Sequence, residues 1–459
     1  MFQKDTIAAI ATGSVNAGIG IIRISGTEAI AVADRIFRAK KQGKTVEQLP
    51  GYSALFGNVC DGDCVLDEAV CLVMRAPNSY TTEDVVELQC HGGRIMLQRI
   101  LDLVLRSGAR PAEPGEFTKR AFLGGRIDAA QAESVMDMIY ARNELAARSS
   151  AAQLRGTLSL RIRELREMIL EHVAYIESAL DDPENYSLEG YGDVLRPQIE
   201  ETLVQVDRLL ATAEEGKLIR EGIRTVILGK PNAGKSSLLN QLLGEERAIV
   251  TEIAGTTRDT LEEDVQIQGI PLRIIDTAGI RDTVDTVEKI GVDKAKNSVT
   301  DADLVLYVVD GARPLDMDDT RIMELLEGRR VITVINKIDV EQTVDKMWIT
   351  ERIKAPVVEL SARTGEGMEE LRKCLTDMFF HGTLSMNDEV YITNLRHKQA
   401  LQEAADSLRQ VLTGLEQQIP EDFLTIDLMA AYEQFGYILG ETLNDDLANE
   451  IFSKFCMGK

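Results

Sequence analysis

The chain has 459 residues and a formal net charge of −24. At about 150 residues per domain, that length predicts about three domains. Hydrophobic residues make up 44% and charged residues 27%, which is typical of a globular protein and excludes a largely disordered one. The acidic balance argues against nonspecific binding of polyanions, which needs clustered Lys and Arg. The sequence has no apolar run of about 18 residues and no signal peptide, so we expect a cytoplasmic protein without a membrane anchor.

Six cysteines are spread along the chain, at positions 60, 64, 71, 90, 374 and 456. They lack the dense spacing of a disulfide framework, so we expect free thiols. Cys60 and Cys64 could form a zinc set with Cys90 and His91. That alternative is weak, because the usual C-x2-C spacing is absent.

The first 118 residues alternate strand-like runs with helix-like runs. TIAAIA, GIGIIRIS, AVCLVMRA and VVELQC are apolar and partly β-branched, whereas AIAVADRIF and RIMLQRILDLVL repeat apolar positions at helical spacing. This pattern predicts an α+β domain over residues 1–118. The spacing over residues 119–216 is helical and is interrupted at DDPENYSLEGYGD, which predicts the first part of a helical domain.

Strands and helices alternate regularly over residues 217–378, which predicts a parallel sheet with crossover helices. A helical stripe returns over residues 379–459, at Leu401, Ala404, Leu408, Leu412 and Leu415. The simplest arrangement joins residues 379–459 to 119–216 as one discontinuous helical bundle. The α/β domain is then an insertion in that bundle.

A phosphate-binding loop begins the α/β region. The strand-like run RTVIL is followed by GKPNAGKSS, Gly229 to Ser237, which matches G-x-x-x-x-G-K-[ST] before a helix. Glycines let backbone amides surround phosphates, and the helix N-terminus adds partial positive charge. Lys235 would reach the β and γ phosphates, and Ser236 would ligate Mg²⁺. A strand before the motif and a helix after it favour a nucleotide site over a chance match.

Three further motifs follow in the order typical of a guanine-nucleotide site. AGTTRD offers Thr256 and Thr257 as a switch, and DTAG offers a carboxylate for the metal side and a glycine amide for the γ-phosphate. In NKID, the carboxylate of Asp339 can accept both N–H groups on the edge of guanine, a pair that adenine lacks. SAR, after another strand, completes the base pocket. We therefore predict an α/β P-loop (Ras-like) G domain.

The residue after DTAG is Ile280, where a Ras-like enzyme has a Gln that orients the attacking water. An aliphatic side chain can neither orient nor polarise water, so other groups must assist hydrolysis. One candidate is Glu288, which could instead be a solvated switch carboxylate. The other is a monovalent cation near Asn232, which would neutralise charge developing between the phosphates.

Sequence runs outside these motifs indicate which family of GTPases the chain resembles. AGIGIIRISG, DVVELQCHGG, PGEFTKRAFLGGRIDAAQAE and the terminal FCMGK together closely resemble the MnmE (TrmE) family of bacterial tRNA-modification GTPases. The resemblance runs from the first strand to the last residue and includes the domain order. It implies a folate-binding, dimerising N-terminal domain, a discontinuous helical domain and an inserted G domain.

The resemblance also implies an activity and partners. The family forms a homodimer and works with the FAD-containing protein MnmG in a heterotetramer or larger assembly. It uses a one-carbon unit of tetrahydrofolate to form a 5-carboxymethylaminomethyl or aminomethyl-type group at C5 of the wobble uridine of certain tRNAs. Its cofactors are GTP, Mg²⁺, K⁺ and a 5-formyl or 5,10-methylene tetrahydrofolate.

Individual roles are implied residue by residue. K⁺ would be surrounded by Asn232, Thr251, Ile253 and Thr256, and Mg²⁺ by Ser236 and Thr257, while Glu288 would position the water. The full set predicted at GTP comprises Asn232, Ala233, Gly234, Lys235, Ser236, Ser237, Thr251, Glu252, Ile253, Ala254, Gly255, Thr256, Thr257, Asp276, Thr277, Ala278, Gly279, Asn336, Lys337, Asp339, Ser361, Ala362 and Arg363.

The positions that match the family's folate site are Arg23, Glu87, Arg126 and Lys459. A carboxylate suits the donor edge of a pterin, and cations suit a glutamyl tail or formyl-type oxygens. Arg23 and Glu87 lie in strand-like runs and could instead simply pair with each other. The chain departs from the family's pattern in GSVNAG, residues 13–18, and at Arg126, where a Lys is frequent and is not equivalent.

Two other functions fit part of the sequence. The G motifs alone would suit a GTP-dependent ribosome or RNA-assembly switch, although no G-x-x-G RNA module is recognised. The tail would suit a lipid-anchored GTPase, but as a C-a-a-X motif it has Lys459 at X and Gly458 at an aliphatic position. We expect instead that the tail returns to the folate pocket. Cys456 there is either a participant in the modification chemistry or a small buried thiol.

Overall fold

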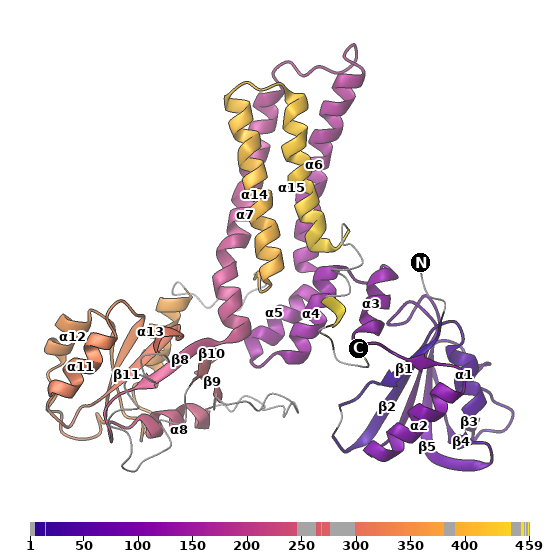
Figure 1. Cartoon of the computed structure of the whole chain (residues 1–459), viewed down its shortest axis with the longest axis horizontal. Coiled ribbons are helices and arrows are strands. Elements are labelled where there is room, and N and C mark those ends of the chain that lie inside the picture. The colour runs from indigo at the N-terminus through magenta and orange to yellow at the C-terminus, as the bar shows by residue number, and fades with distance from the viewer. Residues whose placement is uncertain are drawn as a thin grey trace. The chain divides into compact units, whose positions relative to one another are not determined.

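The computed structural model describes residues 5–13, 15–245, 263–267, 269–275, 299–380, 391–441, 451–453, 455 and 458. The chain divides into two compact units. Unit 1 contains residues 1–136, 158–166 and 435–459, and unit 2 contains residues 137–157 and 167–434. Each unit has its own β-sheet (Figure 1).

The sheet of unit 1 has seven strands in the order β3-β4-β5-β6-β2-β1-β7. Neighbouring strands are antiparallel except β1 and β7, which are parallel. The strands are β1 (Ile7–Ile10), β2 (Ala17–Ser25), β3 (Phe37–Ala39), β4 (Ser53–Asp61), β5 (Cys64–Met74), β6 (Val85–Gly92) and β7 (Arg110–Pro111). Helices α1 (Ala29–Ile36) and α2 (Arg94–Arg106) pack on one face and form the main core of the unit with it.

Side chains alternate along a strand, so residues next to core positions lie on the opposite face of the sheet and are available for a binding site. Ile22 and Ile24 of β2 are fully buried against α1 and α2. Arg23 between them must therefore point to the opposite face. On that face, Phe117 of α3 (Glu116–Leu123) packs against Ile7 in a smaller core cluster.

The helical part of the chain consists of α4 (Ala129–Tyr140), α5 (Glu144–Leu154), α6 (Thr157–Asp181), α7 (Tyr191–Glu221), α14 (Leu395–Glu416) and α15 (Glu421–Leu439). The break between α6 and α7 coincides with the predicted interruption. In unit 2, α14 lies along α7, and Lys398 and Arg409 of α14 pair with Glu214 and Asp207 of α7 at 2.6 and 2.9 Å. Leu401, Ala404 and Leu408 of the predicted stripe are buried, as an amphipathic helix requires.

The sheet of unit 2 has six strands in the order β13-β12-β11-β8-β10-β9. They are β8 (Ile223–Leu228), β9 (Glu263–Ile267), β10 (Ile270–Ile274), β11 (Leu304–Asp310), β12 (Val331–Asn336) and β13 (Val357–Leu360). The prediction of a parallel sheet is wrong for β9, which is antiparallel to β10. The cause is the short link at residues 268–269, because two residues can join only antiparallel strands.

Helices cover both faces of this sheet. The strand β11 contributes Leu304, Leu306 and Val308 to the face packed with α8 (Lys235–Glu245) and α13 (Met368–Phe379). Its alternate residues, Val305, Tyr307 and Val309, pack with α11 (Met317–Leu325), α12 (Lys346–Ile353) and neighbouring strands. In the part of the chain that the structure describes, no helix is both long and apolar enough to cross a membrane. The predicted boundaries after residues 118, 216 and 378 stay predictions.

Candidate functional site

The P-loop of unit 2 has a backbone shape that requires its glycines. It connects β8 to α8, and Gly229, Asn232 and Gly234 have φ of +149°, +65° and +98°. A Cβ on Gly229 would lie 2.2 Å from the carbonyl oxygen of Val308, and one on Gly234 would lie 2.0 Å from Nδ2 of Asn336. The close approach of neighbouring groups, together with the positive φ values, explains why the motif has glycine at these positions.

Lys235, the first residue of α8, turns back toward the loop. Its Nζ donates to the carbonyl oxygens of Gly229 and Lys230, both at 2.8 Å. Burial lowers the pKa of this ammonium group. The next two predicted residues, Ser236 and Ser237, lie in the first turn of the helix, half-buried and exposed respectively. Their backbone N–H groups belong to the helix N-terminus, which favours negative charge.

The predicted base pocket is assembled at the carboxyl ends of β12 and β13. Asn336 is 2% exposed; its Nδ2 donates to the carbonyl oxygen of Ala233 at 3.0 Å and its Oδ1 accepts from the N–H of Ala362 at 2.9 Å. Asp339 accepts from Oγ of Ser361 at 2.8 Å. Motifs separated by more than a hundred residues in the chain are thus joined by one buried amide.

Two charged pairs beside this pocket were not singled out from the sequence. Nζ of Lys337 lies 2.6 Å from Oδ2 of Asp310, the last residue of β11. Lys230 of the P-loop pairs with Asp319 at 2.6 Å. An aspartate at the end of a buried strand was the available signal for Asp310, because strand ends of α/β sheets commonly carry site residues. Nothing local marks Asp319. Arg363 is a looser partner, with Nη1 3.8 Å from Asp339.

Several predicted site residues lie outside the described residues. They are Thr251, Glu252, Ile253, Ala254, Gly255, Thr256, Thr257, Asp276, Thr277, Ala278, Gly279, Glu288, Cys456 and Lys459. Ile280, on which the argument about the missing Gln rests, lies outside them too. Their roles stay predictions.

A second cluster lies in unit 1, on the sheet face opposite the main core. Arg23 and Glu87 are directly opposed on β2 and β6, and Nε of Arg23 lies 2.9 Å from Oε1 of Glu87. The simple pairing considered from the sequence is therefore present. The Arg23 guanidinium also lies over the rings of Tyr80 and Phe117, at 5.4 and 5.6 Å from their centroids. Arg126 lies over the Tyr80 ring as well, at 4.8 Å. Two predicted residues thus lie over one aromatic ring, and the third, Glu87, pairs with one of them.

The tyrosine was missed from the sequence because nothing near it in the chain marks it. Its hydroxyl is 3.0 Å from Oγ1 of Thr118, and its carbonyl oxygen accepts from Nη1 of Arg126 at 3.2 Å. Two guanidinium groups beside one carboxylate and two aromatic rings suit a flat, anionic molecule with hydrogen-bond donors on one edge.

An ion-pair network centred on Arg120 lies next to this cluster. Arg120 is 7% exposed and contacts carboxylates of Asp5, Glu83 and Glu116 at 2.8, 3.0 and 2.9 Å. Burial alone would raise the pKa of Asp5 and of Glu116, but hydrogen bonds and charge from Arg110 and Arg120 outweigh it and lower both values. Glu83 lies in the same loop as Tyr80, so the network fixes the segment that presents the ring.

The described tail residues also lie in unit 1. A Cβ on Gly458 would be 2.2 Å from the carbonyl oxygen of Ile10 at the end of β1. A Cβ on Gly115, just before α3, would be 2.8 Å from Cβ of Phe455 and 2.5 Å from the carbonyl oxygen of Phe452. The described tail residues therefore pack against β1 and the start of α3, the helix that contributes Phe117.

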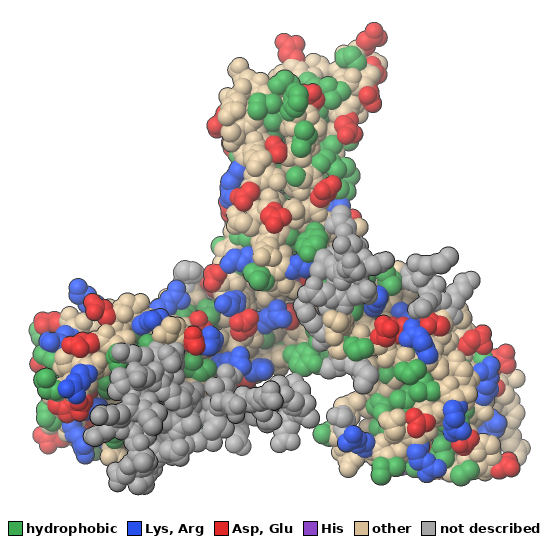
Figure 2. Space-filling model, viewed as in Figure 1, with side chains coloured by type: hydrophobic (Ala, Val, Ile, Leu, Met, Phe, Trp, Pro, Cys, Tyr) green, Lys and Arg blue, Asp and Glu red, His purple; other side chains and the backbone are tan. Residues whose placement is uncertain are grey.

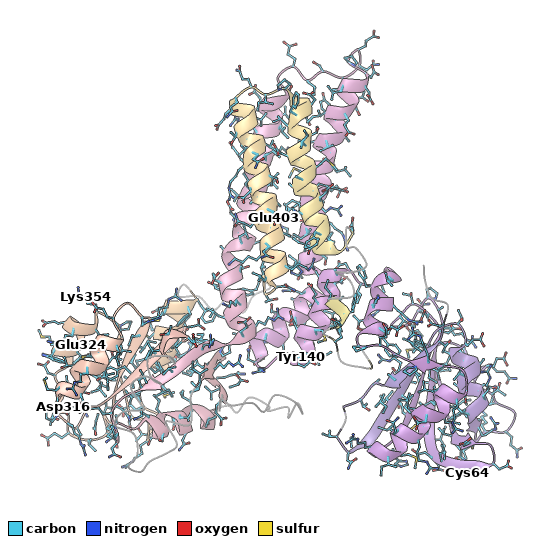
Figure 3. All side chains as sticks on the ribbon, viewed as in Figure 1. Cys64, Tyr140, Asp316, Glu324, Lys354 and Glu403 are labelled. Carbon is cyan, nitrogen blue, oxygen red and sulfur yellow. The ribbon has the colours of Figure 1, made fainter. Side chains whose placement is uncertain are left out.

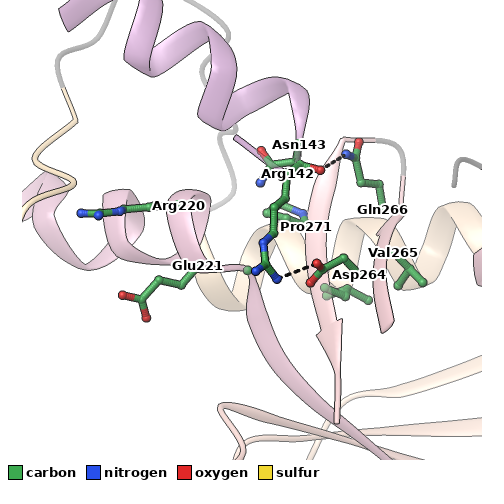
Figure 4. Close-up of a pocket in the computed structure, with 10 residues that line it drawn as sticks. Arg142, Asn143, Arg220, Glu221, Asp264, Val265, Gln266 and Pro271 are labelled. Carbon is green, nitrogen blue, oxygen red and sulfur yellow. Dashed lines mark hydrogen bonds and ion pairs between the residues drawn. The ribbon is translucent and has the colours of Figure 1, made fainter. Parts of the chain in front are cut away.

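In unit 2, the segment between α4 and α5 is joined to β9 (Figure 4). Nη1 of Arg142 lies 2.8 Å from Oδ2 of Asp264, and the carbonyl oxygen of Arg142 accepts from Nε2 of Gln266 at 3.5 Å. Asn143 caps α5 through Ala146 and donates from Nδ2 to the carbonyl oxygen of Ile219 in α7 at 2.8 Å. β9 follows the range that contains the predicted switch threonines, so the helical part is attached directly after that range.

The cysteines do not form a metal cluster in the described ranges. Cys60, Cys71 and Cys90 are buried and Cys64 is exposed, and no three His, Cys, Asp or Glu residues of those ranges converge as ligands. Burial raises the pKa of Cys71 and of Cys90 to about 12, so both thiols are protonated at neutral pH.

The sheet, the P-loop, and the Asn336 and Asp339 pocket of unit 2 define a P-loop GTPase, and the chain is a GTP hydrolase. Two family models match it: the MnmE helical domain over residues 130–456, and the GTP-binding protein TrmE N-terminus over residues 6–126. The chain belongs to the MnmE (TrmE) family. The predicted fold class, with its N-terminal, helical and G domains, is confirmed.

Individual relatives match along the whole chain. The tRNA modification GTPase MnmE of Lachnoclostridium phytofermentans is 51% identical over 457 residues, covering 100% of both chains. The protein of the same name from Clostridioides difficile is 47% identical over 460 residues, again covering 100% of both. Among solved structures, the G domain of the T. maritima iron transporter FeoB is 28% identical and covers 34% of this chain and 97% of its own, but its TM-score of 0.27 adds nothing to the assignment.

Proposed function

We propose that the chain is a K⁺-stimulated GTPase that acts in tRNA modification. With the FAD-containing partner MnmG, it would use a one-carbon unit of tetrahydrofolate to form an aminomethyl-type group at C5 of the wobble uridine of certain tRNAs. The observation that carries the proposal is that one chain contains both the hydrogen-bonded group of Asn336, Asp339 and Ser361, where guanine would bind, and the cluster of Arg23, Glu87 and Arg126. Its full-length relatives are named tRNA modification GTPases.

In the G domain, Asp339 would accept hydrogen bonds from the guanine edge, and the amides of the P-loop would surround the phosphates. Ser236 and Thr257 would hold Mg²⁺. Asn232, Thr251, Ile253 and Thr256 would hold K⁺, which supplies positive charge where an arginine finger acts in other GTPases. Because Ile280 cannot orient water, Glu288 would position it.

In unit 1, Glu87 would accept from the donor edge of a pterin, and Arg23, Arg126 and Lys459 would meet anionic oxygens of the folate. The ion pair between Arg23 and Glu87 is compatible with folate binding by both residues. Arg23 has further donors in its guanidinium fork beyond the Nε that contacts Glu87. Two copies of the chain would form the homodimer of the family.

Wobble-uridine analysis tests the whole proposal. We expect the aminomethyl-type nucleoside to disappear from the tRNA of a deletion strain and to return with the wild-type gene. Unchanged nucleosides would contradict the proposal. The mechanism has its own test: GTP hydrolysis should be faster in KCl than in NaCl, and Glu288→Ala should lower kcat without a matching change in GTP affinity. Equal rates in the two salts would exclude the cation.

The tail is tested separately. Removal of residues 456–459 should leave GTP hydrolysis close to wild type and abolish tRNA modification, because the described tail residues pack within unit 1, which contains the cluster of Arg23 and Glu87. A matched Cys456→Ser variant tells a reacting thiol from a structural tail. Modification that survives the truncation would show that the tail contributes packing alone.

A further inference from the structure

One end of the helical bundle in unit 2 differs in chemistry from the rest. We call it the bundle cap and define it as residues 177–195, from the end of α6 to the start of α7, and residues 410–427, from the end of α14 to the start of α15. The two segments are neighbours: a Cβ on Gly192 would lie 3.2 Å from Cδ2 of Leu415, and Nη1 of Arg196, next to the cap, lies 3.6 Å from Glu416.

The bundle cap has acidic residues and no basic ones. It contains ten Asp and Glu and no Lys or Arg, in a chain whose net charge is −24. Within the described residues, Arg196 is the one cation paired with a cap carboxylate. Elsewhere on α7 and α14, Lys and Arg recur, as at Arg208 and Lys398, whereas α15 has none along its whole length. The acidic residues are Glu177, Asp181, Asp182, Glu184, Glu189, Asp193, Glu416, Glu421, Asp422 and Asp427.

Large apolar side chains are exposed in the same cap. Phe423 and Ile426 of α15 are 56% and 67% exposed. Four others are also exposed: Leu180, Tyr186, Val194 and Ile419. Figure 2 shows hydrophobic side chains gathered over the free end of the bundle, with Asp and Glu around them. A single exposed Leu needs no explanation, but a group of apolar side chains with a charged rim is typical of a binding surface.

The fold does not need these apolar groups. Leu424, Leu428 and Ala431 form the buried face of α15, and all are at most 2% exposed. Phe423 and Ile426 lie one residue before and two residues after Leu424, so helical geometry directs them away from that face. Polar residues at both positions would leave the bundle core unchanged. The apolar side chains therefore require another explanation.

We propose that the bundle cap is the docking surface for the protein partner of the proposed function. This inference rests on that function. The matching face of the partner would carry exposed apolar side chains among Lys and Arg. The charge of the cap selects this chemistry, because complementary charge guides association and like charge opposes it.

The other occupants fit less well. A tRNA is a polyanion and would be repelled by ten carboxylates, of which, in the described ranges, one is paired with a cation. A second copy of the same cap would bring like charges together. A metal ion would need carboxylates that converge, and no such group of three occurs in the described ranges. A protein with an apolar, basic face remains.

The test is direct binding of the purified FAD-containing partner to the full-length chain, with and without GTP. Replacing both exposed residues, Phe423→Ser with Ile426→Ser, should weaken binding and raise the dissociation constant about 30-fold, as expected when an interface loses its apolar anchors. Reversing two rim charges, Glu421→Lys with Asp422→Lys, should weaken binding at low salt and reduce its dependence on salt. All variants should retain wild-type GTP hydrolysis and helical circular dichroism, since the altered side chains are outside the core and the G domain.

Two matched controls keep the result specific. Met347→Ser removes an apolar side chain that is 70% exposed on α12, and Glu403→Lys reverses an exposed charge on α14 outside the cap (Figure 3). Both should bind the partner as the wild type does. A photoreactive benzophenone at position 423 should crosslink to a partner peptide rich in apolar residues and Lys or Arg.

The outcomes separate the two proposals. If the wild type binds and the cap variants bind equally well, the docking surface is refuted and the proposed function stands. If the wild type does not bind the partner in either state, both the partnership and the docking surface are refuted. A crosslink from position 423 to tRNA or to a second copy of the chain would also overturn the inference.

Discussion

Arg120→Met should loosen the loop that presents Tyr80 and thereby weaken folate binding. The substitution keeps the aliphatic stem of a side chain that is 7% exposed and removes its charge. Glu83 then loses its guanidinium partner and Asp5 loses one of two, while Asp5 and Glu116 both keep Arg110, at 2.5 and 2.8 Å. Breaking a fully buried ion pair costs about 3–5 kcal/mol. The side chains of Asp5 and Glu83 are 32% and 27% exposed, so water can partly replace the arginine. We therefore expect a loss of about 2–3 kcal/mol in local stability.

The pH dependence follows from the direction of the pKa shifts. The pKa values of Asp5 and Glu116 are lowered in the folded chain from 3.8 and 4.5. A carboxyl group with a lowered folded pKa stabilises the fold above its unfolded pKa, and this contribution is lost as the pH falls through the folded value. The difference between wild type and Arg120→Met should therefore be complete above about pH 5 and should shrink below about pH 4.

Hydrogen exchange is the suitable assay, because the single Trp348 lies in the G domain and does not report on unit 1. Amides of β1 and of residues 78–84 should exchange about 30 to 150 times faster in the variant at pH 7. Arg106→Met is the control: Arg106 pairs with Asp61 at the surface and should matter by less than about 1 kcal/mol. Equal exchange in the two variants, or a difference that persists at low pH, would refute the reasoning.

Three further results are expected. Tyr80→Ala should weaken 5-formyltetrahydrofolate about tenfold in calorimetry, whereas Tyr80→Phe should bind normally because it keeps the ring that both guanidinium groups contact; equal loss in both would reject the ring as the contact. Asp339→Asn should lower the affinity for GTP about 100-fold, since an amide N–H would face the N–H donors of guanine. In nucleotide competition the variant should instead prefer xanthosine triphosphate. Asn336→Ala should destabilise the G domain by about 2 kcal/mol in urea unfolding followed by Trp348 fluorescence, because the N–H of Ala362 and the carbonyl oxygen of Ala233 lose their buried partner; an unchanged midpoint would contradict it.

The parts of the fold that sequence could predict are those set by neighbours in the chain. The P-loop was predictable because its glycines, lysine and serine act within nine residues, and the strand and helix around it have their own periodicity. The helical stripe of α14 was predictable for the same reason. Strand β9 was not, because EDVQI is short and polar and is recognised only by its pairing with β10.

The contacts that complete the sites are long-range and could not be predicted. Arg23 was found through the resemblance, but Tyr80 and Phe117 are 57 and 94 residues further along the chain, and only the folded sheet brings them beneath its guanidinium group. Likewise Asn336 was expected in the base pocket, but its bond to Ala233 was not. Pairings of this kind depend on tertiary packing, which local patterns do not encode.

Contacts with the protein core support the shape of the P-loop. Gly229 lies against the carbonyl oxygen of Val308 in β11, and Gly234 lies beneath the side-chain amide of Asn336 in β12. The same amide bonds to Ala233 and Ala362. Strands of the core therefore support the positive φ values, and a loop held by protein contacts has a smaller ordering cost when it binds a ligand. A substitution at Gly234 or Asn336 would weaken nucleotide binding by changing the shape of the loop, even though neither substitution removes Lys235 or its charge.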